Sequence, residues 1–140
     1  MEIHIRQVQS SEMDDLFKLV ETFATSFKPN EQSFKENIEF LLSDNSVFLR
    51  VAEYNNELIG YCLGFDHYTF YANGRVSWVE ELMVEATYRN QGIGKILMEH
   101  FEEWSKSRGS KLIALATRRA APFYKGLGYE ESAAYFRKLL

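Results

Sequence analysis

The chain has 140 residues, of which 46% are hydrophobic and 26% are charged, a composition that predicts one globular domain over residues 1–140. Its net charge of -4 argues against a nucleic-acid partner, and its single cysteine, Cys62, excludes an internal disulfide, which is typical of a cytoplasmic protein. No apolar run approaches the roughly 20 residues of a membrane span and the N-terminus does not resemble a signal peptide, so we expect no membrane partner.

The first part of the chain predicts a strand and two helices. Residues 3–8 alternate between apolar and polar side chains, as in a half-buried strand. Ser10 or Ser11 is then placed to cap a helix, which Pro29 ends. A shorter amphipathic helix follows at residues 31–42, and the two helices would cover a sheet. The apolar stripe of the first helix consists of Met13, Leu16, Phe17, Val20, Phe23 and Phe27.

The middle of the chain predicts an antiparallel meander of three strands. Asn55-Asn56 and Asn73-Gly74 are turn sequences, and the second is a strong hairpin signal. The strands are expected at residues 47–54, 57–68 and 75–84.

The last part predicts a crossover from this meander to a parallel strand. An amphipathic helix ends near Gly109, and a small apolar strand follows at residues 112–116. A short helix that closes at Gly128 and a final strand at 134–139 complete the chain. We expect an α/β fold with a mixed, mostly antiparallel sheet of six to seven strands and about four helices on its two faces. The helix face consists of Ile93, Ile96, Leu97, Phe101 and Trp104.

The start of this helix is bare, positive and rich in glycine. Helix N-termini favour acidic side chains, yet there is none between Arg89 and Met98. Gly92 and Gly94 remove side chains from the backbone, and Lys95 adds a positive charge. The combination predicts an anion site, most simply for a phosphate. The plainer alternative is that these are ordinary turn glycines with Asn90 as the N-cap.

Two common phosphate loops do not fit this stretch. A dinucleotide-binding fingerprint would need a third glycine where Leu97 stands. A P-loop would need glycine in place of Arg89 and serine or threonine in place of Ile96.

The pattern Arg89-x-x-Gly92-x-Gly94 after an apolar strand resembles the acetyl-CoA pyrophosphate loop of the GNAT superfamily of N-acetyltransferases. About 30 residues later, the segment from Ala120 to Tyr129 resembles that superfamily's Ala-x-x-Phe-Tyr-x-x-x-Gly-Phe motif. The predicted order of elements agrees with the GNAT fold over nearly the whole chain. Two motifs, each in its expected context, are far more specific than either one.

The resemblance implies acetyl-CoA, or coenzyme A, as cofactor and a small-molecule amine as acceptor. Thr117 departs from the pattern, because the family often has asparagine there and a hydroxyl would have to serve. Tyr129 replaces a more common phenylalanine, and the final hairpin is trimmed. The cofactor-binding residues implied are Leu82, Met83, Val84, Arg89, Asn90, Gln91, Gly92, Ile93, Gly94, Lys95, Thr117, Phe123 and Tyr124.

The chemistry implied is acetyl transfer to an amine, which needs a base and an acid. An alkylamine has a pKa of about 10.4, so a group must take its proton. Glu80 and Glu81 are the candidates, and we expect only one to face the acceptor unless a bulge alters the alternation. Residues 78–84 are similar to the same strand of the spermidine/spermine acetyltransferases, which favours Glu80. Tyr124 is the candidate acid, and a backbone N–H of this strand would stabilise the oxyanion.

The acceptor and the assembly stay open at this stage. A small primary amine, such as a polyamine, is the leading expectation; alternatives are a protein lysine or N-terminus, and a non-catalytic acyl-CoA sensor. Tyr68, Phe70 and Tyr71 either wall the acceptor site or pack at a homodimer interface. The three histidines show no metal-ligand spacing, so we expect no metal site.

Overall fold

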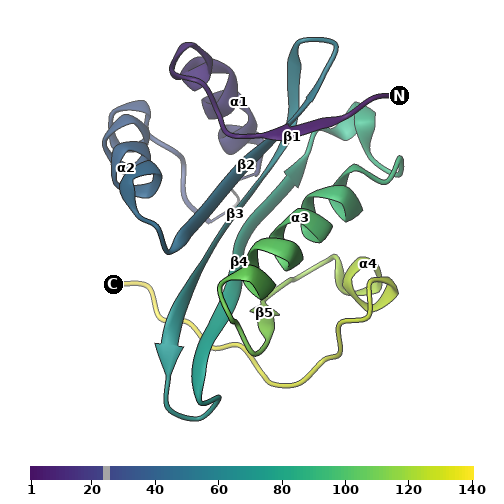
Figure 1. Ribbon diagram of the computed structural model, residues 1–140. Helices are drawn as coiled ribbons and strands as arrows, with labels where there is room; N and C mark the ends of the chain where they lie inside the picture. Colours follow the sequence, from purple (N-terminus) through teal and green to yellow (C-terminus); the bar gives the residue numbers. More distant parts are fainter. Residues whose placement is uncertain (24–25) are drawn as a thin grey trace.

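The computed structural model describes residues 1–23 and 26–140. In these ranges one sheet contains five strands: β1 (His4–Arg6), β2 (Val47–Tyr54), β3 (Glu57–Thr69), β4 (Gly74–Val84) and β5 (Ile113–Leu115). They lie side by side in chain order, and every pair is antiparallel except β4 and β5 (Figure 1). The meander and the parallel crossover are confirmed, whereas the expected six to seven strands were too many.

Four α-helices in the described ranges flank this sheet: α1 (Met13–Phe23), α2 (Glu31–Ser43), α3 (Ile93–Ser107) and α4 (Ala121–Gly126). Figure 1 shows α1 and α2 on one face and α3 on the other, with α4 beside α3. The α/β architecture with helices on both faces is therefore as expected. None of the helices in the described part of the chain is long and apolar enough to cross a membrane.

The first helix begins and ends differently from the sequence-based expectation. A 3-10 turn at Ser10–Glu12 precedes α1, and neither serine caps the helix. Instead, the Glu12 carboxylate accepts a hydrogen bond of 2.8 Å from the backbone N–H of Gln9. Phe27 was expected in the apolar stripe but lies beyond the helix and is exposed. The predicted helical residues 24–25 lie outside the described residues.

Buried side chains form a separate core on each face of the sheet. On the α3 face, Phe48 and Phe101 pack edge to face with ring centroids 5.2 Å apart. On the α1/α2 face, Tyr61 and Met83 are buried under the two helices. Each buried apolar side chain contributes about 1.5–3 kcal/mol of transfer free energy, so both layers of helices are held to the sheet mainly by burial.

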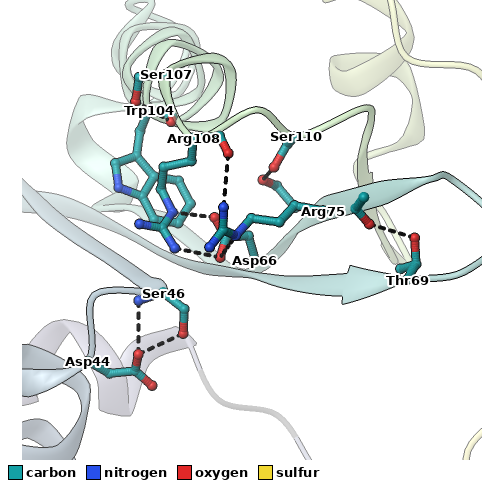
Figure 2. Close-up of polar contacts among 11 residues, drawn as sticks. Asp44, Ser46, Asp66, Thr69, Arg75, Trp104, Ser107, Arg108 and Ser110 are labelled. Atoms are coloured by element: carbon teal, nitrogen blue, oxygen red, sulfur yellow. Dashed lines mark hydrogen bonds and ion pairs between the residues drawn. The ribbon is translucent and has the colours of Figure 1, made fainter.

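A buried carboxylate fixes the C-terminal end of α3. The side chain of Asp66 on β3 lies between the guanidinium groups of Arg75 on β4 and Arg108 at the end of α3, as Figure 2 shows. Arg108 binds it with two N–H groups, the Nη2–Oδ1 distance being 3.0 Å, and Arg75 Nη1 donates to the Arg108 carbonyl oxygen at 3.3 Å. This paired charge locks α3 against β3 and β4, because breaking a buried ion pair leaves an uncompensated charge.

The C-terminal segment does not form the predicted strand at residues 134–139. Residues 129–140 run past the sheet as extended chain and end on the side of α2 (Figure 1). Arg137 Nη1 donates to Ser26 Oγ at 3.0 Å, while Phe136 is 89% exposed. Tyr135 and Phe136 are residue types that favour strands, but a strand also needs a hydrogen-bonding partner, and the sheet ends at the three-residue β5.

Candidate active site

The N-terminal turn of α3 is open, as expected. Gly92 is the N-cap and has a φ of 83°, a left-handed conformation that glycine adopts without strain. No described side chain caps the helix and there is no acid in its first turn. Asn90, the alternative N-cap, has a φ of 64° and belongs to the preceding turn. The first N–H groups of α3 therefore point out of the helix as a ready anion site.

Gly94 lets α3 and α4 approach closely at this point. A Cβ atom at Gly94 would lie 3.1 Å from Cζ of Phe123, tighter than nearly all real contacts. Phe123 is exposed on its other side and stacks edge to face on Tyr124, with ring centroids 4.9 Å apart. The second sequence motif is thereby packed directly against the first.

We expect Gly94→Ala to weaken acetyl-CoA binding, because the new methyl group would push α4 away from the start of α3. The KM for acetyl-CoA should rise by about tenfold, the size of a mild overpacking effect. Initial-rate kinetics at varied acetyl-CoA would measure it. Gly126→Ala is the matched control, since a Cβ there meets no atom within 4 Å. An equal rise in both variants would contradict the role of this contact.

Basic and polar side chains surround the open turn. Lys95 and Gln91 are exposed, and Arg89 donates from Nε to the Val84 carbonyl oxygen at 3.0 Å. This bond uses one edge of the Arg89 guanidinium and ties it to the end of β4. The positive side chains expected around a diphosphate are thus present beside the α3 N–H groups.

β4 and β5 separate next to this turn. β5 pairs only with Ser77–Val79, so the later residues of β4 have no described strand on that side. The Val84 carbonyl faces the open side, because it bonds Arg89 rather than β3, and Leu82 presents its backbone groups to the same side. We call this opening the β4/β5 split. It leaves strand-like donors and acceptors for an extended ligand arm, as expected for Leu82 and Val84.

Two of the expected cofactor-binding residues have buried side chains. Met83 is buried in the α1/α2-side core, and Ile93 is buried in the α3-side core. Thr117 also has a structural role, because its Oγ1 accepts a hydrogen bond of 3.0 Å from the Ala120 N–H, just before α4. A contact of its hydroxyl with the cofactor stays a prediction.

A β-bulge lies at the start of the split. Leu63 on β3 is opposite Glu81, while the next residue, Gly64, is opposite Val79, so Glu80 is an extra residue on β4. Bulges bend a strand and increase its twist. The bend begins directly after the last residue of β4 that pairs with β5, which accounts for the separation of the two strands.

The bulge places both glutamates on the α1/α2 face. Val79 packs in the α3-side core but Glu81 lines a cavity on the other face, although residues two apart on a regular strand share a face. The Glu80 carboxylate accepts a hydrogen bond of 2.9 Å from Nε1 of Trp78, which precedes Val79 and faces away from that core. The regular alternation that would place the two glutamates on opposite faces does not hold for this strand, because the bulge interrupts it.

Glu81 is the half-buried member of the pair. Burial raises the pKa of its carboxyl; a hydrogen bond of 2.7 Å from the Tyr61 hydroxyl opposes this rise, and the charge of Glu80 adds to it. The cavity it lines has a volume of about 210 Å³ and lies between α1, α2 and the sheet. Glu80 is exposed and does not line this cavity. The geometry therefore favours Glu81 over Glu80 as a base for a bound molecule.

Tyr124 lies on the opposite face at the same level of β4. It packs against the α3-side core, which contains Cys62 and against which Leu82 also packs; Leu82 pairs with Cys62 across β4 and β3 and directly follows Glu81. Burial raises the pKa of Tyr124 to about 12, so it carries its proton at neutral pH. Burial also raises the pKa of the Cys62 thiol to about 12, which makes this sulfur a poor nucleophile.

The exposed aromatic residues do not reach the cavity. Tyr68, Phe70 and Tyr71 lie at the β3–β4 hairpin, exposed to solvent, and the Arg75 guanidinium lies 4.4 Å from the Tyr68 ring centroid. None of the three lines the cavity, and both expectations for these rings, acceptor walls and dimer contacts, stay predictions.

The sequence model of the acetyltransferase (GNAT) family matches residues 11–129, most of the chain. The chain belongs to the GNAT acetyltransferase family. An aminoalkylphosphonate N-acetyltransferase of Salmonella typhimurium is 29% identical, over 97% of this chain and 90% of its own. The structure of glucosamine-6-phosphate N-acetyltransferase from Arabidopsis thaliana has a TM-score of 0.87 at 19% identity, covering 99% of both chains. An aminoglycoside N-acetyltransferase in complex with CoA has a TM-score of 0.83 at 19% identity, covering 98% of this chain and 95% of its own.

As a GNAT protein, the chain is an acetyl-CoA-dependent N-acetyltransferase, and its own residues suit this cofactor. The donors at the start of α3 suit a diphosphate. Gly94 keeps that turn free of a side chain, and the backbone at Leu82 and Val84 suits an amide-bearing arm. The resemblance inferred from the two sequence motifs is confirmed.

Sequence reasoning missed Tyr61 and the cavity. Tyr61 lies 20 positions before Glu81, and nothing in the local pattern shows that its hydroxyl meets that carboxylate. Residues 58–63 read as one nearly continuous apolar run, so the face of each residue was not defined. Only the pairing of β3 with β4 brings the two groups together.

Proposed function

We propose that this GNAT enzyme moves an acetyl group directly from acetyl-CoA to the primary amine of a small molecule. The observation that carries this proposal is Glu81: a half-buried carboxylate with a raised pKa, at the wall of a small cavity and beside the β4/β5 split. A base with a pKa closer to neutral accepts a proton more effectively than an ordinary surface carboxylate.

The residues divide the proton transfers between the two faces of the sheet. Glu81 would take the amine proton as the C–N bond forms, and Tyr124 would give a proton to the sulfur as the C–S bond breaks. A backbone N–H of β4 would stabilise the charge on the carbonyl oxygen. The high pKa of Cys62 supports direct transfer rather than an acetylated cysteine. The net change is one amide and one thiol from one thioester and one neutral amine.

Release of free thiol from acetyl-CoA on addition of amines tests this function. We expect release that depends on both substrates and yields the acetylated amine by mass spectrometry. Binding of CoA without release by any amine in a broad panel would favour the non-catalytic sensor instead.

Two finer expectations from the sequence belong to this proposal. The expected polyamine-like acceptor shares its reacting primary amine with other small amines, and the Glu80 and Glu81 carboxylates suit that amine, whereas a protein substrate would need an open groove in place of a cavity of about 210 Å³. A homodimer is supported by the exposed rings of Tyr68, Phe70 and Tyr71 at one hairpin. The homodimer and the cytoplasmic location stay predictions.

A further inference from the structure

The cavity beside Glu81 is lined mainly by hydrocarbon. Side chains from both helices and from β2, β3 and β4 line it, and Asn30, the N-cap of α2, adds polar surface together with Ser33 and Asn37 on α2. The Asn30 side chain is already used, since its oxygen caps α2 by accepting from the Ser33 N–H at 2.9 Å. The apolar walls include Leu16, Val20, Phe34, Ile38, Leu41 and Leu49.

Glu81 is the only charged side chain among the described residues that line this cavity. No lysine or arginine is among these lining residues, and three cations of the same side or of the neighbouring strand are engaged or lie outside the wall. Lys35 is exposed and pairs with Glu31 at 3.3 Å, while the Arg50 guanidinium lies 4.9 Å from the Phe48 ring centroid on the α3 side. Arg137 bonds Ser26 outside the cavity wall. An anionic group on a bound amine would therefore lose its water without gaining a cation.

The same reasoning applies to a second ammonium group. The one carboxylate in the wall would be occupied by the reacting amine, so a further positive charge would lie against Leu41 and Phe34 or their neighbours. Burying an unpaired charge is strongly unfavourable, whereas apolar groups gain from the same walls.

Resting on the transferase function above, we propose that the acceptor is a primary amine whose remaining part is uncharged and mainly apolar. An engineered cavity of about 150 Å³ with apolar walls holds benzene, so the volume of about 210 Å³ suits one ring or a chain of similar size. The class comprises short alkylamines and arylalkylamines. It excludes acceptors that bear a phosphate, phosphonate or carboxylate, and unbranched diamines.

Matched pairs of amines test this class because each pair differs in charge and little in shape. The pairs are n-pentylamine against putrescine, phenethylamine against phenylalanine, and aminoethylphosphonate against the amine that bears a tert-butyl group in place of the phosphonate. We expect kcat/KM from thiol release to favour the uncharged member by about 100-fold, the effect of several kcal/mol for one unpaired ion. A preference for the charged member of each pair would overturn the proposal.

Ligand-induced thermal shift of the intact protein separates this inference from the catalytic one. A larger rise in Tm with the uncharged members, but no thiol release, would support the acceptor class and overturn the transferase function. Thiol release that is faster with the charged members would keep the transferase function and overturn the acceptor class. Equal kcat/KM values within every pair would also overturn the acceptor class, because the cavity would then not discriminate between acceptors by their charge.

A change of wall chemistry gives an independent check. Asn37→Asp adds a carboxylate of nearly the same shape to the cavity wall, and should raise the putrescine-to-pentylamine ratio of kcat/KM by about tenfold, as expected for a hydrogen bond to a charged group. Asn37→Leu is the control and should leave this ratio low. An unchanged ratio in the aspartate variant would contradict the assignment of this cavity to the acceptor.

Discussion

Replacement of Glu81 by glutamine is expected to lower kcat by about 100-fold or more at neutral pH, the usual contribution of a positioned general base. Glutamine keeps the shape of the side chain and can still accept the Tyr61 hydrogen bond, but it cannot take the amine proton. The KM for acetyl-CoA should change little, because Glu81 faces the cavity rather than the α3 turn. Steady-state thiol release at saturating acetyl-CoA measures the effect.

Two neighbouring variants check that Glu81 is the titrating group. Tyr61→Phe removes a hydrogen bond that favours the charged carboxylate, so the pKa of Glu81 should rise and the acidic limb of kcat/KM should move to higher pH. Glu80→Gln removes a like charge, so the same limb should move to lower pH. The amine is identical in all three profiles, hence these opposite shifts belong to the enzyme. If Glu80→Gln abolished turnover while Glu81→Gln did not, Glu80 would be the base.

Tyr124→Phe should lower kcat by about 100-fold while the dissociation constant for CoA changes by less than a few-fold. The ring remains, so its packing against Phe123 and Tyr129 is kept, and only the proton donor is lost. With a pKa of about 12, the hydroxyl is protonated throughout the neutral range, and no acidic-range titration should report it. Kinetics together with calorimetric CoA titration measure the two quantities.

Tyr129→Phe is the control for this substitution. Tyr129 is a neighbouring tyrosine, but its hydroxyl donates to the Glu102 carboxylate at 2.7 Å and is therefore engaged on α3. The Tyr129→Phe variant should keep nearly the full kcat. Parallel losses of rate and CoA affinity in Tyr124→Phe would show that Tyr124 binds the cofactor rather than protonating the sulfur.

Features that depend on neighbouring residues in the chain could be predicted from the sequence. The limits of β2 are as expected, and those of β3 and β4 agree to within one residue, because apolar runs and the turn residues between them define these limits locally. The open start of α3 was also predictable, since missing acids and paired glycines are visible in a few residues.

Features that depend on distant pairing could not be predicted. The bulge at Glu80 is defined by the register with β3, so alternation alone assigned the two glutamates to opposite faces. The Asp66–Arg108 pair joins residues 42 positions apart. The segment at 134–139 shows the opposite error: the sequence predicted a strand there, but the sheet provides no strand for it to pair with.

The extra residue on β4 bears on how such a site could evolve. If Glu80 is left out, the side chains of β4 alternate as in a regular strand. Val79 and Leu82 pack on the α3 side, and Met83 packs on the α1/α2 side. Insertion or deletion of a single codon at this point would leave every other residue on its own side. An ancestral β4 that paired with β5 along its whole length could therefore gain the β4/β5 split, and with it room for a thioester, while the cores on both faces of the sheet stayed unchanged.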